Sequence, residues 1–550
     1  MSASFSAETF DYVIVGAGAA GSVIANRLSE NPDLQILLLE AGGSEITSAV
    51  ESPHRWNEVL LTELDWAYMG EPQPGLAERQ VYSASGQGLG GTSNVYHMIH
   101  TRGRAADYDN WAYQGAAGWS FQEVLPYFQK LEDQADDTNP TAGKGGPIHV
   151  MNAKAMGSPV SQSFIDACVE LGYPLVEDFN REDDAQSGFG VGWHHVDIKD
   201  GKRCGVRTGY LEPAMRRPNV TVRSHCLAGR LLFAGNRCVG VEYRQDGVVK
   251  SVHASQEVVL CAGAIQTPKL LLLSGIGNPE QLEQFDIPVL LDLPGVGENF
   301  HDHPLVIGPI GLMSKPGPDP QGNVTEVALF WGSEAGLAVP DLEICLVHRA
   351  PFGEAFFANV IKRVQTGQPV APVKELVDPR IILALPGLVR PLSRGWVRLA
   401  SSDPAIYPKV SANYFGEKAD LDRTVQMVQM TREIYATNSF AKAWGLMELS
   451  PGSKVNSYEA LEEWVINNVG SYYHFVGSCK MGIDRMAVVD SRLKVHGLDG
   501  LRIVDASIMP AVPSANPHTA VVMIGERAAD FIKEELSSTP VARQQAVLAV

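Results

Sequence analysis

The chain has 550 residues and a mass of 59.5 kDa, which predicts more than one domain and a core large enough to enclose a ligand. Apolar residues make up 45% and charged residues 19%, so a wholly disordered chain, a collagen-like repeat and a small disulfide scaffold are excluded. With 63 acidic against 44 basic residues, the net charge of −19 repels phosphate backbones, and nucleic acid is not an expected partner.

The location is predicted from the cysteines and from hydropathy. Seven cysteines are scattered without a CxxC pair, which favours buried thiols in a reducing cytoplasm over a zinc site or disulfide framework. The N-terminus lacks the basic start and apolar run of a signal peptide, and no apolar stretch reaches membrane-spanning length. We therefore expect a soluble, cytoplasmic and bacterial protein without a membrane span.

The first structural unit in chain order has the pattern of a dinucleotide-binding motif. An apolar strand at residues 12–15 runs into the glycine turn 16–21 and a helical pattern, and a second apolar strand, Ile36–Leu39, ends in Glu40. Gly16 permits the tight turn, Gly18 lets backbone amides approach a pyrophosphate, and Gly21 allows close helix–strand contact. Glu40 is placed to accept hydrogen bonds from a ribose diol. Because an acidic group here disfavours a 2′-phosphate, it argues against NADP. This unit alone does not separate NAD from FAD.

Later segments have the character of the same domain. Residues 257–260 form an apolar strand that leads to a leucine-rich helix after Pro268. Residues 501–504 form another strand, which ends in Asp505, and residues 517–534 read as a final helix. The nucleotide domain is therefore expected to be discontinuous, with a second domain inserted.

Five sequence blocks occur in a fixed order: residues 16–21 with Glu40, 90–103, 263–277, 293–304, and 474–482 with 504–507 and 516–517. Together they resemble the glucose–methanol–choline (GMC) flavoprotein oxidoreductases, and the resemblance covers residues 10–535. Within the family the chain resembles choline-oxidase-like and choline-dehydrogenase-like members, through residues 54–56, 65–66 and 326–330. The resemblance implies FAD rather than NAD, and oxidation of an alcohol by hydride transfer to the flavin.

The fold expected from this resemblance is α/β (α+β overall). A Rossmann-like FAD-binding domain is interrupted by a substrate-binding domain built on an antiparallel sheet flanked by helices. The expected boundaries give the FAD-binding domain residues 1–155, 201–312 and 470–537, the substrate domain residues 156–200 and 313–469, and a flexible tail residues 538–550.

His474 and Asn516 are the expected catalytic residues. A histidine suits proton abstraction because its pKa lies near neutral pH, and in the family the residue matching His474 faces the reactive edge of the flavin. Asn516 precedes Pro517 and can also be read as a helix cap, but the family places His or Asn here as the second hydrogen-bonding partner of the alcohol oxygen.

The resemblance also implies the contacts to FAD. They are Gly16, Gly18, Ala19, Ala20, Gly21, Glu40, Ala41, Gly90, Gly91, Thr92, Ser93, Asn94, Val95, Ala262, Asp505, Ala506, Asn516, Pro517, His518 and Thr519. We expect non-covalent FAD, because Val95 stands where choline oxidases carry the flavin-linked histidine. Covalent attachment through His97 stays an alternative, since strand alternation would keep residues 95 and 97 on one side.

Substrate contacts are expected from Trp56, Tyr96, His97, Glu326 and Tyr473. Tyr96 and His97 replace an Asn-Gly pair, as in aryl-alcohol oxidases. Glu326 resembles the carboxylate that faces a quaternary ammonium in choline-oxidising relatives, but residues 323–325 lack the expected aromatic side chains. A different alcohol, such as an amino alcohol, is therefore favoured over choline. The run His301-Asp302-His303 is assigned no metal.

The predicted function is FAD-dependent oxidation of a primary alcohol to an aldehyde, with oxygen or another acceptor reoxidising the flavin. The alternatives are an FAD-bound lyase or light-driven decarboxylase of the same fold, or a non-catalytic FAD-binding protein. The sequence leaves oxidase and dehydrogenase activity equally open, and it is compatible with a homodimer.

Overall fold

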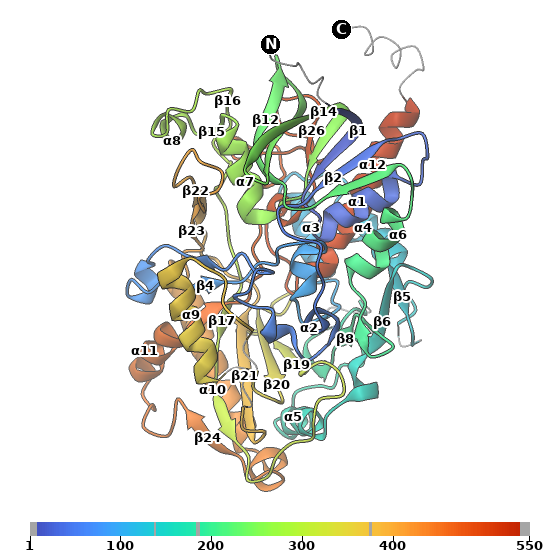
Figure 1. Ribbon diagram of the computed structural model, residues 1–550. Helices are drawn as coiled ribbons and strands as arrows, with labels where there is room; N and C mark the ends of the chain where they lie inside the picture. The colour runs from blue at the N-terminus through green and yellow to red at the C-terminus, as the bar shows by residue number, and fades with distance from the viewer. Residues whose placement is uncertain (1–7, 137–138, 183–187, 352, 373–376, 539–550) are drawn as a thin grey trace.

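The computed structural model describes residues 8–136, 139–182, 188–351, 353–372 and 377–538. Of the expected tail, residues 539–550 lie outside this range, and Ser538 ends the last helix, α12 (His518–Ser538). Two sheets dominate the molecule (Figure 1). One lies in the upper half of the view, together with α1 and α12, and the other lies in the lower half.

The upper sheet has seven strands and a parallel core. Its parallel strands run in the order β11 (Val220–Arg223), β2 (Ile36–Leu39), β1 (Glu8–Val15), β14 (Val248–Leu260) and β26 (Leu501–Ile503). Strands β12 (Leu227–Ala234) and β13 (Arg237–Gln245) extend it in antiparallel pairing. All four residues of β2 are buried, as apolar strands covered on both faces require. The expected strands near residues 12, 36 and 501 are confirmed, and residues 257–260 end a longer strand.

The leucine-rich helix α7 (Gly263–Leu273) begins earlier than expected, with Pro268 inside it. Proline has no backbone N–H, so the carbonyl of Ala264, four residues earlier, loses its helical partner. The Ser478 hydroxyl donates to that carbonyl at 2.6 Å instead. The hydroxyl of Ser478, which is distant in the chain, therefore supplies to α7 the hydrogen bond that Pro268 cannot make.

The lower sheet has eight strands and is antiparallel throughout. Its main path is β24 (Met447–Ser450), β18 (Ile310–Leu312), β21 (Ile381–Leu388), β20 (Leu342–Val347), β19 (Thr325–Trp331) and β7 (Gly190–Trp193). β17 (Pro304–Val306) pairs with β21 and with β25 (Val469–Ser471). The expected boundary at residue 312 therefore falls after two strands, β17 and β18, that belong to this sheet.

Helices α5 (Pro159–Glu170) and α10 (Lys418–Ala436) cover the lower sheet. One buried cluster joins Phe164 of α5 and Met427 of α10 to Val327, Ile344 and Ile382 of the sheet. A separate core surrounds the upper sheet, where α1 (Ala19–Leu28) packs beside α12. The fold is thus a mixed α/β architecture with an antiparallel substrate-side sheet, as the fold-class prediction states.

Candidate active site

The glycine turn after β1 lies at one end of a cavity that Gly16, Gly18 and Glu40 help to line. Gly16 has φ +104°, and a Cβ there would lie 2.5 Å from the Cys261 carbonyl oxygen. A Cβ on Gly21 would lie 2.0 Å from the Gly16 oxygen, so both glycines are required by packing. Gly18 differs, because its nearest protein neighbour would be 4.0 Å away. The space beside Gly18, at the start of α1, suits the phosphates of a dinucleotide.

Glu40 lines the same end and bridges three backbone amides. Its carboxylate accepts from Ala17 N at 2.9 Å, Gly42 N at 2.8 Å and Gly88 N at 3.0 Å. Burial raises the pKa of Glu40, although the three amides favour its charged form. The carboxylate therefore holds the loops that surround the expected ribose position, and its contact with a ribose stays a prediction.

The loop at residues 90–95 packs against the glycine turn. Gly91 has φ +53°, and a Cβ on it would lie 2.7 Å from the Gly18 Cα atom. Residues Gly91–Asn94 form a 3₁₀ turn, and residues 95–97 after it are not a strand, so the expected strand alternation of Val95 and His97 is wrong, although both residues line the cavity. The local hydrogen bonds of the turn explain the difference, because Val95 N donates to Thr92 O at 3.0 Å.

Most of the expected FAD contacts meet at this one cavity. The residues that line it are Gly16, Gly18, Ala19, Ala20, Glu40, Ala41, Gly91, Thr92, Ser93, Val95, Ala262, Asp505, Ala506, Asn516, Pro517 and His518. Gly21, Gly90, Asn94 and Thr519 lie behind this lining, and Asn94 Nδ2 donates to Leu89 O at 2.8 Å. These four residues shape the backbone around the cavity rather than its surface.

Asp505 ties the end of the upper sheet to α7. Its carboxylate accepts from Gly263 N at 2.9 Å and from the Thr267 hydroxyl at 2.6 Å, and burial raises its pKa. Because β26 ends here beside β14, the carboxyl ends of two parallel strands meet at the cavity, where α/β folds bind nucleotides.

His474 lies at the other end of the cavity and is held at three of its atoms. Its backbone N–H donates to Asp302 Oδ1 at 2.7 Å, Asn516 Nδ2 lies 3.3 Å from its Nε2, and His303 Nδ1 lies 2.9 Å from its Nδ1. Since the Asn516 amide nitrogen donates, Nε2 accepts and the proton of neutral His474 lies on Nδ1. Nε2 is thus the basic nitrogen, and Asn516 stands beside it.

Electrostatics keep His474 neutral. Burial lowers its pKa well below the usual value, and the neighbouring His303 and His97 lower it further. The Tyr472 ring stacks on the imidazole with centroids 4.4 Å apart, which fixes the plane of the ring. A neutral, oriented imidazole is the form that can accept a proton.

His303 and Asp302 are site residues that sequence reasoning did not identify as partners of His474. Asp302 also accepts from the Ser471 hydroxyl at 2.5 Å and from Tyr414. Burial raises the Asp302 pKa to about 6, and burial lowers the His303 pKa to about 3. The sequence signal for these two residues was the run of two histidines that flank an aspartate. The sequence does not show, however, that this run faces residue 474.

Four of the five expected substrate contacts, Trp56, Tyr96, His97 and Tyr473, line the cavity. The Trp56 and His97 rings lie 4.1 Å apart, and burial lowers the His97 pKa to about 3. The fifth, Glu326, does not line the cavity. The Glu326 carboxylate accepts from Ser158 N at 2.8 Å and from the Ser161 hydroxyl at 2.6 Å, so the structure turns it toward the start of α5.

The cavity fits FAD by two observations. The packing of the protein leaves the space beside Gly18 open, and any side chain at this position would fill that space. At the far end, Asn516 Oδ1 is buried without a hydrogen-bond partner in the described part of the chain, so it is an acceptor that a bound ligand can satisfy. Both ends of one continuous cavity are therefore built for a ligand.

Comparisons with known proteins agree with this geometry. The chain is 38% identical to an oxygen-dependent choline dehydrogenase of Klebsiella pneumoniae, covering 95% of this chain and 96% of that protein. It is 37% identical to the mitochondrial choline dehydrogenase of Mus musculus, covering 96% and 90% of the two chains. Pyridoxine 4-oxidase from Mesorbium loti superposes with a TM-score of 0.85 at 30% identity, covering 96% and 99%.

The family assignment rests on two matched regions. The N-terminal and C-terminal models of the GMC oxidoreductases match residues 10–305 and 391–525, which together hold the glycine turn, His474 and Asn516. The chain therefore belongs to the GMC oxidoreductase family.

Proposed function

We propose that this FAD-dependent alcohol oxidoreductase converts a primary alcohol to an aldehyde, with His474 as the acceptor of the hydroxyl proton. The observation that carries the proposal is the neutral His474 imidazole in the cavity, with Nδ1 paired to His303 and Nε2 beside Asn516. The relatives named choline dehydrogenase and pyridoxine 4-oxidase support oxidation of a small molecule that bears a hydroxyl group.

FAD, when bound, supplies the hydride acceptor of the reaction. Gly18 and the start of α1 would hold its pyrophosphate, and Glu40 its ribose. The loop containing Gly91 and Ser93 would lie against the isoalloxazine. We expect the FAD to be bound without a covalent link, because Val95 has no group that could attach it.

The residues around His474 have separate roles in the proton transfer. His474 Nε2 receives the hydroxyl proton after the alcohol takes the place of the Asn516 N–H, because Nε2 has one lone pair. The imidazolium that forms keeps its second proton directed at His303 Nδ1. The Asn516 amide, beside Nε2, orients the alcohol oxygen. Tyr472 and the apolar wall around it exclude water from the new charge.

The partners of the reaction follow from this proposal. They are a small alcohol and either oxygen or another electron acceptor. No helix in the described residues has the length and apolarity needed to cross a membrane. A cytoplasmic location is supported by the seven cysteines, each of which is a buried free thiol.

An anaerobic absorbance experiment tests the reaction class. The purified FAD-loaded protein is mixed with a panel of primary alcohols while the flavin band is followed, and air is then admitted. Bleaching by at least one alcohol is expected, and fast return of colour in air would mark an oxidase. A flavin that dithionite bleaches but that no alcohol of the panel bleaches would contradict the proposal.

A further inference from the structure

We propose that the alcohol is uncharged and has an apolar body, so that choline is a poor substrate for this chain despite its relatives. This inference rests on the proposed function, because it concerns the part of the cavity beside His474. Its basis is an apolar wall beside His474 that contains no carboxylate among the described residues lining the cavity.

The wall beside His474 is formed by one apolar cluster. Tyr472, which stacks on His474, is buried together with Leu305, Val347, Leu383 and Leu385. All five side chains belong to residues that line the cavity. They come from β17, β20, β21 and the segment after β25, so the lower sheet supplies a rigid surface for the substrate.

The carboxylates of the cavity are elsewhere. Among the described residues that line it, the carboxylates are Glu40 and Asp505, and both accept hydrogen bonds from backbone amides at the nucleotide end. Glu326, expected to face a quaternary ammonium, is held by Ser158 and Ser161 at the start of α5. Among the described residues that line the cavity, a cationic substrate would thus find no acidic partner beside His474, because Asp302, which binds the His474 backbone N–H, is not part of the lining.

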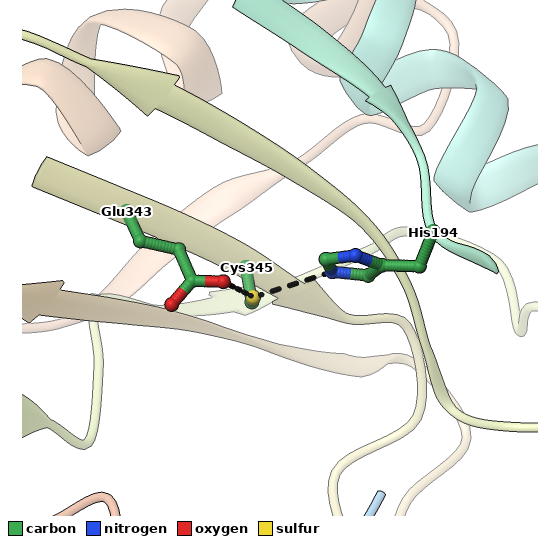
Figure 2. A group of neighbouring side chains, drawn as sticks. All are labelled: His194, Glu343 and Cys345. Carbon is green, nitrogen blue, oxygen red and sulfur yellow. Dashed lines mark hydrogen bonds between the residues drawn. The ribbon is translucent and has the colours of Figure 1, made fainter. Parts of the chain in front are cut away.

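Glu343 is the carboxyl group behind Tyr472, but it does not line the cavity. Its Oε1 lies 3.4 Å from Cys345 Sγ, which in turn lies 3.7 Å from His194 Nε2 and 3.3 Å from the Tyr472 hydroxyl. Figure 2 shows Glu343 and His194 on either side of Cys345 in the lower sheet. Burial raises the Glu343 pKa to about 7, so the group is partly uncharged at neutral pH. Glu343 therefore offers little counter-charge to a ligand.

Two of the aromatic rings that line the cavity, Tyr472 and Tyr96, each have a face that another side chain already covers. One face of Tyr472 is covered by His474. The Tyr96 ring stacks on His518 at 4.1 Å, and the Arg203 guanidinium carbon lies 5.1 Å from the same ring. His518 and Arg203 thus occupy positions against the Tyr96 ring, and cation recognition requires accessible ring faces.

A matched pair of alcohols isolates the effect of charge. Choline and 3,3-dimethyl-1-butanol have the same shape and differ in whether the branched centre is a quaternary nitrogen or a carbon. A cation that is buried without a counter-charge loses hydration energy, whereas the hydrocarbon gains from leaving water. Anaerobic flavin reduction of the wild-type protein should therefore be at least about tenfold faster with the uncharged alcohol at equal concentration.

Variants of single residues test whether the apolar wall causes the preference for the uncharged alcohol. Leu305→Glu should raise the rate with choline relative to its isostere, whereas the matched uncharged variant Leu305→Gln should not. Glu326→Gln should leave the ratio of the choline rate to the 3,3-dimethyl-1-butanol rate at its wild-type value, because serines bind that carboxylate outside the cavity. FAD content is measured for each variant to confirm that it folds.

The outcomes separate the two proposals. Choline reducing the wild-type flavin as fast as its isostere, or faster, overturns the present inference and leaves alcohol oxidation intact. A loss of choline reduction in Glu326→Gln alone would also overturn it, by returning the cation site to Glu326. Failure of every alcohol to reduce the flavin contradicts the proposed function itself.

Discussion

His474 shows how single residues set the chemistry of this site. Its ring is fixed in plane by Tyr472, and its two nitrogens are distinguished by His303 and Asn516. The motif around residue 474 predicts a catalytic histidine, but the partner of its Nδ1, His303, lies 171 residues away in the chain. Long-range pairing of this kind is set by the fold and cannot be read from local pattern.

The pH dependence of kcat/KM tests the protonation state of His474. A base works when deprotonated, and burial with His303 and His97 lowers the His474 pKa below its usual 6.5. The group therefore stays neutral as the pH falls through 6.5, and the acid limb of kcat/KM should have its midpoint below that value.

The same profile measured on Glu343→Gln is the control for this prediction. Burial raises the pKa of Glu343 to about 7, but this group lies behind Tyr472 and outside the cavity lining, so the acid limb should remain in that variant. A wild-type midpoint at 6.5 or above would contradict the neutral, buried imidazole.

At the scale of elements, the parallel core follows from sequence more closely than the loops do. β2 coincides with the expected strand Ile36–Leu39, because its uninterrupted apolar run suits a strand buried on both faces. Residues 95–97, which do not form a strand, and the start of α7 differ from expectation. A local hydrogen bond closes the turn before residues 96–97, whereas α7 accepts a hydrogen bond from the distant Ser478 hydroxyl, which local propensity does not encode.

Two glycines of the first turn make a matched pair for testing nucleotide binding. Gly18 has extended backbone geometry and open space, so Gly18→Val should leave the thermal midpoint of the FAD-free protein nearly unchanged while reducing FAD content strongly. Gly21→Ala places a Cβ 2.0 Å from the Gly16 oxygen and should lower that midpoint as well. Gly18→Val with wild-type FAD content would show that the phosphates bind elsewhere.

At the scale of the whole molecule, the cavity joins segments from both sheets. Gly16 and Asp505 follow β1 and β26 of the upper sheet, Leu305 and Leu383 belong to β17 and β21 of the lower sheet, and all four line one space. The resemblance predicts this two-part architecture. The pairing of β17 and β18 with β21 could not be predicted, because register across distant strands is fixed by packing.

Removal of FAD should therefore destabilise the molecule as a whole. A ligand present at about 100 times its Kd stabilises the folded state by about 2.7 kcal/mol. Acid treatment should release the flavin into the supernatant, and FAD-free protein prepared by gentle extraction should melt at a lower temperature, with recovery on adding FAD. Flavin that stays with the acid-precipitated chain would point to covalent attachment at His97.

The most direct test of the account is stopped-flow flavin reduction by His474→Ala, with an alcohol that bleaches the wild-type flavin. Loss of the proton acceptor should slow reduction about 10²- to 10⁴-fold, while FAD content and the thermal midpoint stay close to wild type. Reduction at a near wild-type rate by this variant, with FAD fully bound, would remove His474 from the chemistry and contradict the central claim.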